Sequence, residues 1–451
     1  MKDLTSGNIY KNFIAFTLPL ILTGILSQSF SIVNSIMVGK LLGDAELAYI
    51  GSTSSVIDVA DAIIWGFGTG IAIYVGKLFG AKESSRMVNA IKTSLLTLCL
   101  LAVVISVICI AFYRPIFSYL KIKEDIYTGS LVYYLIMIGG LVILSFNWGS
   151  VYIFNAIGDS TFPFITSLLS TFATVLGNAL VLIVFKWGVF GTAIVTLFVN
   201  LVVDILHIFK FRQMFNKIGI IKQRIVFDKA DIISSVKLGM PCLIQQAVLY
   251  FSGAAVQPLV NSLGTAAIAA YSICLRLYSL NANVFGNVSK CLSSYCVQVV
   301  GAGQVEKIKK GVKTSLVLAF SASVPLMILY LALSRPISGL FFTDVESQSA
   351  LYVQRYIVLC VPFFIFQILN NMLHNFFKGV MVPKIAFYTT AFYTLVRIVS
   401  TKWLVPAWEM DGVYAGFIIA WVLECLLSII IYVSKKWKSK EYIMLENQGI
   451  A

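Results

Sequence analysis

Long apolar stretches follow one another along the chain, separated by short polar segments. A helix needs about 20 mostly apolar residues to cross a bilayer. Windows of that length give twelve segments, at 12–38, 48–79, 88–112, 127–155, 162–185, 188–211, 232–260, 266–300, 312–334, 350–378, 383–406 and 411–434. They are too long and continuous for the alternating strands of an outer-membrane barrel. The N-terminal region shows no small-residue cleavage pattern of a signal peptide, so we expect the first segment to be retained as a membrane helix. The pattern predicts an all-α polytopic membrane protein with twelve transmembrane helices.

An internal repeat divides these segments into two sets of six. A shift of 221 residues aligns "LGDAELAYIG" (42–51) with "LGTAAIAAYS" (263–272), and "KTSL" at Lys92 with "KTSL" at Lys313. Because six is even, both halves enter the membrane from the same side, which predicts a pseudo-two-fold axis along the membrane normal. We expect two six-helix lobes around a central cavity.

The repeat also sets the expected boundaries and bends. The predicted parts are an N-terminal lobe at 1–211, a basic cytoplasmic linker at 212–230, a C-terminal lobe at 231–434 and a cytoplasmic tail at 435–451. Pro19 and Pro241 fall one residue out of step in the repeat. Proline interrupts the hydrogen bonds of a helix interior, so both are candidate bend positions.

Charge gives the orientation. Residues are 59% hydrophobic and only 12% charged, against roughly 25% charged in a soluble domain. With the N-terminus inside, 23 of the 34 Lys and Arg residues fall in inside segments and 7 in outside loops. This asymmetry predicts cytoplasmic termini in a bacterial-type cell membrane. The net charge of +14 does not indicate nucleic-acid binding, because the basic residues sit in short loops on one side. We expect a monomer.

Motifs of an enzyme are missing. The only histidines, His207 and His374, lie in apolar segments without an HExxH spacing, and the eight cysteines contain no CxxC. No Walker A sequence is present, so we expect neither ATP hydrolysis nor any cofactor or metal.

Several runs in order resemble the multidrug and toxic compound extrusion (MATE) transporters. They are "PLILTGILSQSFSIVNSIMVGKLLGDAELAYIG", "GTGIAIYVGKLFGAK", "NAIGDSTFP" and "GVFGTAIVT". The resemblance covers essentially all twelve segments. It implies a two-lobe antiporter that exports amphipathic, often cationic organic molecules in exchange for protons or sodium ions.

The resemblance also exposes a departure. Many family members carry a coupling aspartate where this chain has Asn34, and a second acid four residues after the asparagine matched by Asn178, where this chain has Leu182. Asn34 and Asn178 remain candidate cation-site residues. The familiar carboxylates are nevertheless absent from both matching positions.

Asp58 and Asp61 are the candidate replacements. A carboxylate inside a membrane helix costs about 2.5–3.5 kcal/mol on insertion scales, so it usually has a function. Three residues apart, the two acids share nearly one helix face and form a candidate proton or cation site. The alternative is that they cap an outer turn or pair with Arg276, whose repeat-equivalent position is Ser55.

Other polar residues within the segments are candidates for the substrate cavity or for helix packing. The cavity candidates are Asn155, Gln245, Gln246, Arg276, Asn370 and Asn371, with interhelical hydrogen bonding as the alternative role. Asp204 and Glu424 lie late in their segments, where snorkelling or salt bridging is expected. Arg397 and Lys290 would repel a cationic substrate, so we expect them to be neutralised or turned toward the cytoplasm.

Two further functions stay open. A flippase for a lipid-linked saccharide or another amphiphile would share the broad architecture, but it favours a strongly cationic cavity for diphosphate. A membrane scaffold or receptor would need neither buried acids nor a repeat-built cavity.

Overall fold

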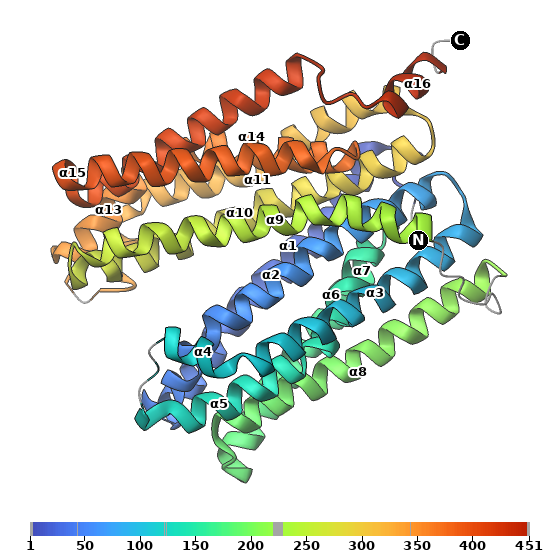
Figure 1. Ribbon diagram of the computed structural model, residues 1–451. Helices are drawn as coiled ribbons and strands as arrows, with labels where there is room; N and C mark the ends of the chain where they lie inside the picture. Colours follow the sequence, from blue (N-terminus) through green and yellow to red (C-terminus); the bar gives the residue numbers. More distant parts are fainter. Residues whose placement is uncertain are drawn as a thin grey trace. The chain divides into compact units, whose positions relative to one another are not determined.

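The structure, a computed structural model, describes the backbone of residues 3–42, 44–120, 122, 124–219, 229–342 and 344–448. The described side chains exclude those of residues 29, 31–42, 44, 45, 47, 48, 440, 441 and 448. Over the described residues the chain folds into helices joined by short turns (Figure 1). It forms two compact units, one within residues 22–243 and the other of residues 3–21 and 244–451.

The first unit contains the helices of the first repeat. They are α2 (Asp44–Gly80), α3 (Ser84–Ala111), α4 (Tyr113–Tyr119), α5 (Glu124–Gly139), α6 (Leu141–Ala156), α7 (Thr161–Leu180) with the π-turn η1 (Val181–Phe185), and α8 (Gly188–Lys217). α5 and α6 are bent by 44° across Gly140, and together they correspond to the predicted segment 127–155.

The second unit repeats this arrangement. Its helices are α10 (Thr265–Gly301), η2 (Val305–Lys307), α11 (Ile308–Ala332), α12 (Ser334–Gly339), α13 (Gln348–Cys360), η3 (Val361–Phe363), α14 (Phe364–Gly379), α15 (Pro383–Val433) and α16 (Lys440–Gln448). α15 comprises two predicted segments, because Glu409 leaves the helical conformation at φ 48° and ψ −123°. A Cβ on Gly412 would lie 2.6 Å from the carbonyl carbon of Leu404, so the two arms of α15 turn back closely on each other.

α1 (Ile9–Leu42) and α9 (Lys229–Asn261) are each divided between the units. The first half of α1, through Ile21, packs with the second unit, and the first half of α9, through Leu243, packs with the first unit. Pro19 and Pro241 each stand two residues before the end of such a half. The predicted bend positions therefore coincide with the places where the two helices change units.

Length and apolarity support a polytopic membrane protein. Nine helices in the described part of the chain are long and apolar enough to cross a bilayer, or ten if the bent pair α5 and α6 forms one span. α10 is not among them, since it carries several polar residues, including Asn281, Asn287 and Lys290. Each of the twelve predicted segments has a helical counterpart, and the all-α fold is confirmed.

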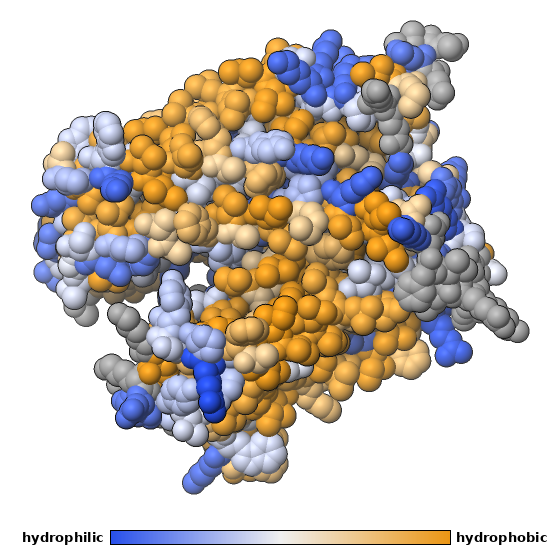
Figure 2. All heavy atoms as spheres, viewed as in Figure 1, coloured by the Kyte–Doolittle hydropathy of each residue, from blue (hydrophilic) through white to orange (hydrophobic). Residues whose placement is uncertain are grey.

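Each unit has its own apolar core. Phe117, Tyr134 and Phe154 are fully buried in the first unit, and Phe364 and Trp421 in the second. Within each unit, apolar side chains also cover much of the outside, with polar side chains gathered toward the helix ends (Figure 2). This surface fits a lipid environment, in which apolar side chains need no covering.

Candidate functional site

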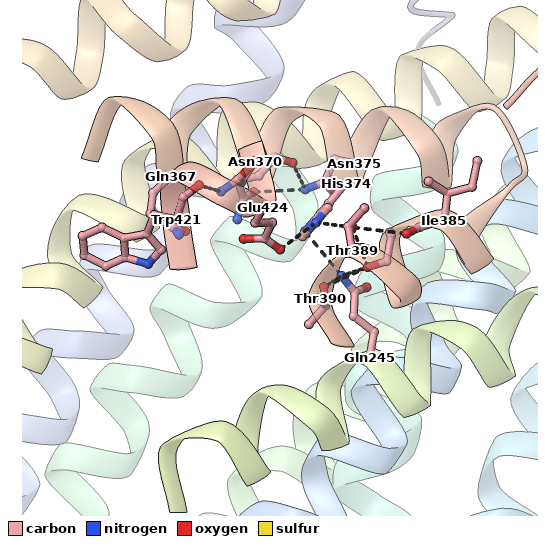
Figure 3. A network of polar contacts seen from close by, with 12 residues as sticks. Gln245, Gln367, Asn370, His374, Asn375, Ile385, Thr389, Thr390, Trp421 and Glu424 are labelled. Atoms are coloured by element: carbon pink, nitrogen blue, oxygen red, sulfur yellow. Dashed lines mark hydrogen bonds and ion pairs between the residues drawn. The ribbon is translucent and has the colours of Figure 1, made fainter. Parts of the chain in front are cut away.

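His374 and Glu424 form a buried polar pair inside the second unit (Figure 3). Nε2 of His374, on α14, lies 3.2 Å from Oε1 of Glu424, on the second arm of α15. The side chains are 13% and 4% exposed. α14 and α15 pack along each other, so two residues far apart in the sequence meet between apolar helix faces.

Three polar side chains besides Glu424 border or lie next to the imidazole, those of Thr389, Gln245 and Thr390. Nε2 also lies 2.9 Å from Oγ1 of Thr389, whose hydroxyl donates to backbone carbonyls. Nδ1 lies 3.4 Å from Nε2 of Gln245, an amide nitrogen that can only donate. A neutral ring with its proton on Nε2 satisfies these contacts, because it donates toward Glu424 and accepts from Gln245.

Gln245 connects this pair to the first arm of α15. Its amide nitrogen also lies 2.9 Å from Oγ1 of Thr390 and 3.3 Å from the carbonyl oxygen of Ala386, so its two hydrogens are shared among three acceptors. Its Oε1 is buried without a hydrogen-bond partner among the described residues. A second proton on His374, at Nδ1, would need an acceptor there, and rotation of the Gln245 amide would supply Oε1.

The other cavity candidates of the second unit pack between helices. Asn370 donates to the carbonyl of Trp421 at 3.0 Å (Figure 3). Oδ1 of Asn371 accepts from Asn375 at 3.1 Å. Gln246 is half-buried, and Arg276 is exposed. For Asn370 and Asn371, interhelical or local hydrogen bonding is the observed role, and a cavity role stays a prediction.

Arg397 departs from the expectation that it would be neutralised. Its side chain is buried, and its guanidinium donates to hydroxyl groups only, those of Ser252, Tyr271 and Tyr393. None of the ion pairs in the described part of the chain includes it. The hydroxyl groups around the guanidinium accept its hydrogen bonds, but no acidic side chain forms an ion pair with it in the described part of the chain.

Asp58 and Asp61 lie on α2 in the first unit, as the sequence predicts. Asp58 is exposed and Asp61 is half-buried. Oδ1 of Asp61 is enclosed without a hydrogen-bond partner among the described residues, close in sequence to the similarly unpartnered indole nitrogen of Trp65. Two acids on one helix face, one of them underbonded, can take up a proton or a cation.

Asp204 shows no snorkelling, contrary to expectation. Asp204 is 5% exposed on α8, which packs along α6. Oδ1 of Asp204 and Nδ1 of the neighbouring buried His207 have no hydrogen-bond partner in the described structure. The side chain of Asp204 does not extend toward the end of α8, because the face of α8 that carries it packs on α6.

The remaining candidates of the first half are spread over three helices. Asn178 is buried on α7 beside the π-turn that contains Leu182, and Asn155 is half-buried on α6. Asn34 lies in α1, but its side chain is outside the described residues. Lys290 of the second unit is exposed and donates to Asn287.

Sequence analysis missed His374 as a site residue and expected only a salt bridge or snorkelling for Glu424. Glu424 lies within salt-bridge distance of His374, a contact that is a salt bridge only when the imidazole is protonated, and the buried carboxylate does not snorkel. The available signal was a histidine in the segment 350–378 and an acid in the segment 411–434, which the segment 383–406 separates.

Comparisons with known proteins confirm the family resemblance. The MatE family profile matches residues 19–180 and 241–403, so it covers both halves. Among curated relatives, the "Probable multidrug resistance protein YoeA" of Bacillus subtilis is 24% identical over 347 residues, which is 75% of each chain. The "FAD transporter" of Shewanella oneidensis is 25% identical over 375 residues, 76% of this chain and 77% of its own.

A solved structure shows the same fold. It is described as the outward-facing conformation of a multidrug resistance MATE family transporter of the MOP superfamily. It superposes with a TM-score of 0.88 at 17% identity, over 96% of this chain and 98% of that chain.

Proposed function

Because the chain belongs to the MATE family of multi-pass membrane transporters, we propose that it is a secondary antiporter that exports amphipathic organic compounds in exchange for protons or sodium ions. The family consists of transporters and not of enzymes. The name of the Bacillus relative, a probable multidrug resistance protein, supports drugs as substrates, and the name of the Shewanella relative, an FAD transporter, supports a broader chemical range.

The observation that carries the coupling proposal is the buried pair of His374 and Glu424. A carboxylate inside a membrane protein is costly unless it is paired or used, and intramembrane acid and histidine chains are typical of proton relays. Histidine changes its charge near physiological pH and does not bind alkali cations well. The pair therefore favours the proton over sodium as the coupling ion at this position.

The contacts of the pair suggest how a proton would act. With His374 neutral, Nδ1 accepts from Gln245, which in turn holds Thr390 and Ala386 on the first arm of α15. A proton on Nδ1 would face the amide nitrogen of Gln245, so that two hydrogen-bond donors would meet without an acceptor. The Gln245 amide would then have to rotate and present Oε1 to the ring. Proton binding would thereby change the hydrogen bonds that join α9, α14 and α15.

Asp58 and Asp61 are the second proposed coupling site. They replace, on another helix, the acids that the family resemblance leads one to expect at Asn34 and Leu182. The unpartnered Oδ1 of Asp61 supports this role, since a proton or sodium ion would satisfy it. Pairing of these acids with Arg276 stays the alternative.

Transport in proteoliposomes tests the proposal. Purified protein is reconstituted, and uptake of a fluorescent amphipathic compound is followed under an imposed proton or sodium gradient of either sign. We expect a proton gradient to drive uptake in the parent protein. Glu424→Gln should abolish this uptake, while Glu306→Gln, the same exchange at an exposed acid of the second unit, should not.

The two coupling sites separate in the same assay. Loss of uptake in both Glu424→Gln and the double variant Asp58→Asn and Asp61→Asn is expected if both sites couple transport. Loss in Glu424→Gln alone assigns coupling to the second unit, and loss in the double variant alone assigns it to the first. Gradient-independent equilibration by the parent protein would refute antiport altogether.

A further inference from the structure

Arg397 holds a positive charge inside the second unit without an acid beside it. Its side chain is 6% exposed. One terminal nitrogen, Nη1, donates to Oγ of Ser252 at 3.2 Å and to the hydroxyl of Tyr393 at 3.4 Å. The other, Nη2, donates to the hydroxyl of Tyr271 at 3.0 Å, and Nε has no hydrogen-bond partner in the described structure.

A buried cation in this state is expensive. A charged group removed from water loses several kcal/mol unless a counter-charge or a set of hydrogen bonds replaces its hydration. Hydroxyl oxygens replace part of it, and the face of the Phe417 ring, 4.2 Å from the guanidinium carbon, supplies a weaker attraction. No ion pair in the described part of the chain includes Arg397, so an anionic group beside the guanidinium would lower the cost of its burial.

The surrounding groups are also suited to an anion. A hydroxyl that accepts a hydrogen bond from the guanidinium still has its own hydrogen to donate. Ser252, Tyr271 and Tyr393 can therefore each donate to an acid group that approaches Arg397, together with the unused Nε–H. Charge-assisted hydrogen bonds from arginine are strong and match the planar geometry of carboxylate, sulfonate or phosphate oxygens.

Aromatic side chains next to Arg397 define the rest of the ligand. The ring of Phe417 lies 5.3 Å from that of Trp421 and 6.3 Å from that of Tyr271, between centroids. Trp421 in turn stacks on Tyr278 at 5.9 Å. An acid group at Arg397 would thus have a flat apolar wall beside it, which fits an aromatic or acyl body.

We propose that Arg397, with Ser252, Tyr271 and Tyr393, binds the acid group of the exported compound. The cargo is then an amphipathic organic anion or a zwitterion, and not a simple organic cation. This inference rests on the proposed export function and names its substrate class. Because Arg397 is nearly enclosed, the anion reaches it when the bordering helices part, which is the opening step of an alternating-access cycle.

A matched pair of probes isolates the charge. 1-Naphthalenesulfonate and 1-naphthylmethylammonium share one ring system and carry opposite charges. Binding of each to the purified full-length protein in detergent micelles is measured by calorimetric titration. We expect the parent protein to bind the sulfonate at least tenfold more tightly than the ammonium compound.

Substitutions assign the preference to Arg397. Arg397→Gln should weaken sulfonate binding about tenfold or more, the range of a hydrogen bond to a charged group. Arg397→Lys keeps the charge without the planar donor geometry and should lose less. Arg335→Gln removes an exposed arginine of the same unit and should leave both affinities unchanged. If Arg397→Gln does not fold, Tyr271→Phe tests the same site and should weaken the sulfonate alone.

Two results would overturn the inference: a parent protein that prefers the ammonium probe, or a folded Arg397→Gln variant with unchanged sulfonate affinity. Binding in detergent needs no ion gradient. A protein that binds the sulfonate through Arg397 but shows no gradient-driven uptake would therefore refute the antiport proposal and leave the anion site standing.

Discussion

Removal of His374 should destabilise the protein much more than neutralisation of its partner Glu424. In His374→Ala, the carboxylate of Glu424 stays buried and loses the imidazole, whose Nε2 lies 3.2 Å from it. In Glu424→Gln, the amide oxygen can still accept the proton on Nε2 of His374, and no charge is left behind. The asymmetry follows from the neutral imidazole that the contact with Gln245 indicates.

The magnitudes can be estimated from burial. Breaking a buried pair so that one charge remains costs about 3–5 kcal/mol, and the Glu424 side chain is 4% exposed, so the full range applies. Glu424→Gln exchanges one charge-assisted hydrogen bond for a neutral one, a loss of about 1 kcal/mol. We therefore expect a difference of about 2–4 kcal/mol between the two variants.

His207→Ala provides the matched control. His207 is buried in the first unit, where Nε2 contacts Oγ1 of Thr166, and no described acid pairs with it. Both alanine variants leave the cavity of an imidazole, so their difference isolates the unpaired carboxylate. Equilibrium unfolding in mixed micelles of dodecyl sulfate and maltoside gives the free energies.

Equal losses in His374→Ala and His207→Ala would show that Glu424 does not depend on the imidazole. A loss of several kcal/mol in Glu424→Gln would show that His374 is charged in the resting protein. Either result would refute the assignment of a neutral ring and the Gln245 rotation built on it.

Three more predictions follow from single positions. Asp61→Asn should leave the free energy of unfolding unchanged or raised, because Oδ1 of Asp61 has no hydrogen-bond partner among the described residues to lose. Gradient-driven uptake should fall to background in the same variant. A clear loss of stability would instead indicate that Asp61 pairs with a cation. Gly70→Ala should destabilise the first unit by about 1–3 kcal/mol or more, because the added Cβ would lie 2.1 Å from the backbone of α9. Gly51→Ala on the same helix adds its Cβ in open space and should not change the stability. Equilibrium unfolding measures both variants. In a background without native cysteines, Gln348→Cys should react with an impermeant thiol reagent outside intact cells and Asn216→Cys should not, and the reverse labelling would overturn the orientation.

The sequence by itself was sufficient for the membrane class and the two-fold repeat. The thickness of the bilayer requires about 20 apolar residues for a crossing helix, and apolar runs of that length can be identified in the sequence without a structure. The duplicated motifs, such as "KTSL" at Lys92 and Lys313, likewise need no structure to be seen. Asp58 and Asp61 stood out for the same reason, since an acid in an apolar segment is visible as an exception.

Partners of buried charges could not be predicted in this way. Glu424 meets His374 because α14 packs on α15, and Arg397 meets Tyr271 because another helix brings the hydroxyl to it. Residue type gives the charge of a side chain, whereas the free energy of that charge depends on the atoms around it, which come from distant segments. The tertiary structure alone decided that Glu424 is paired and that Arg397 is not.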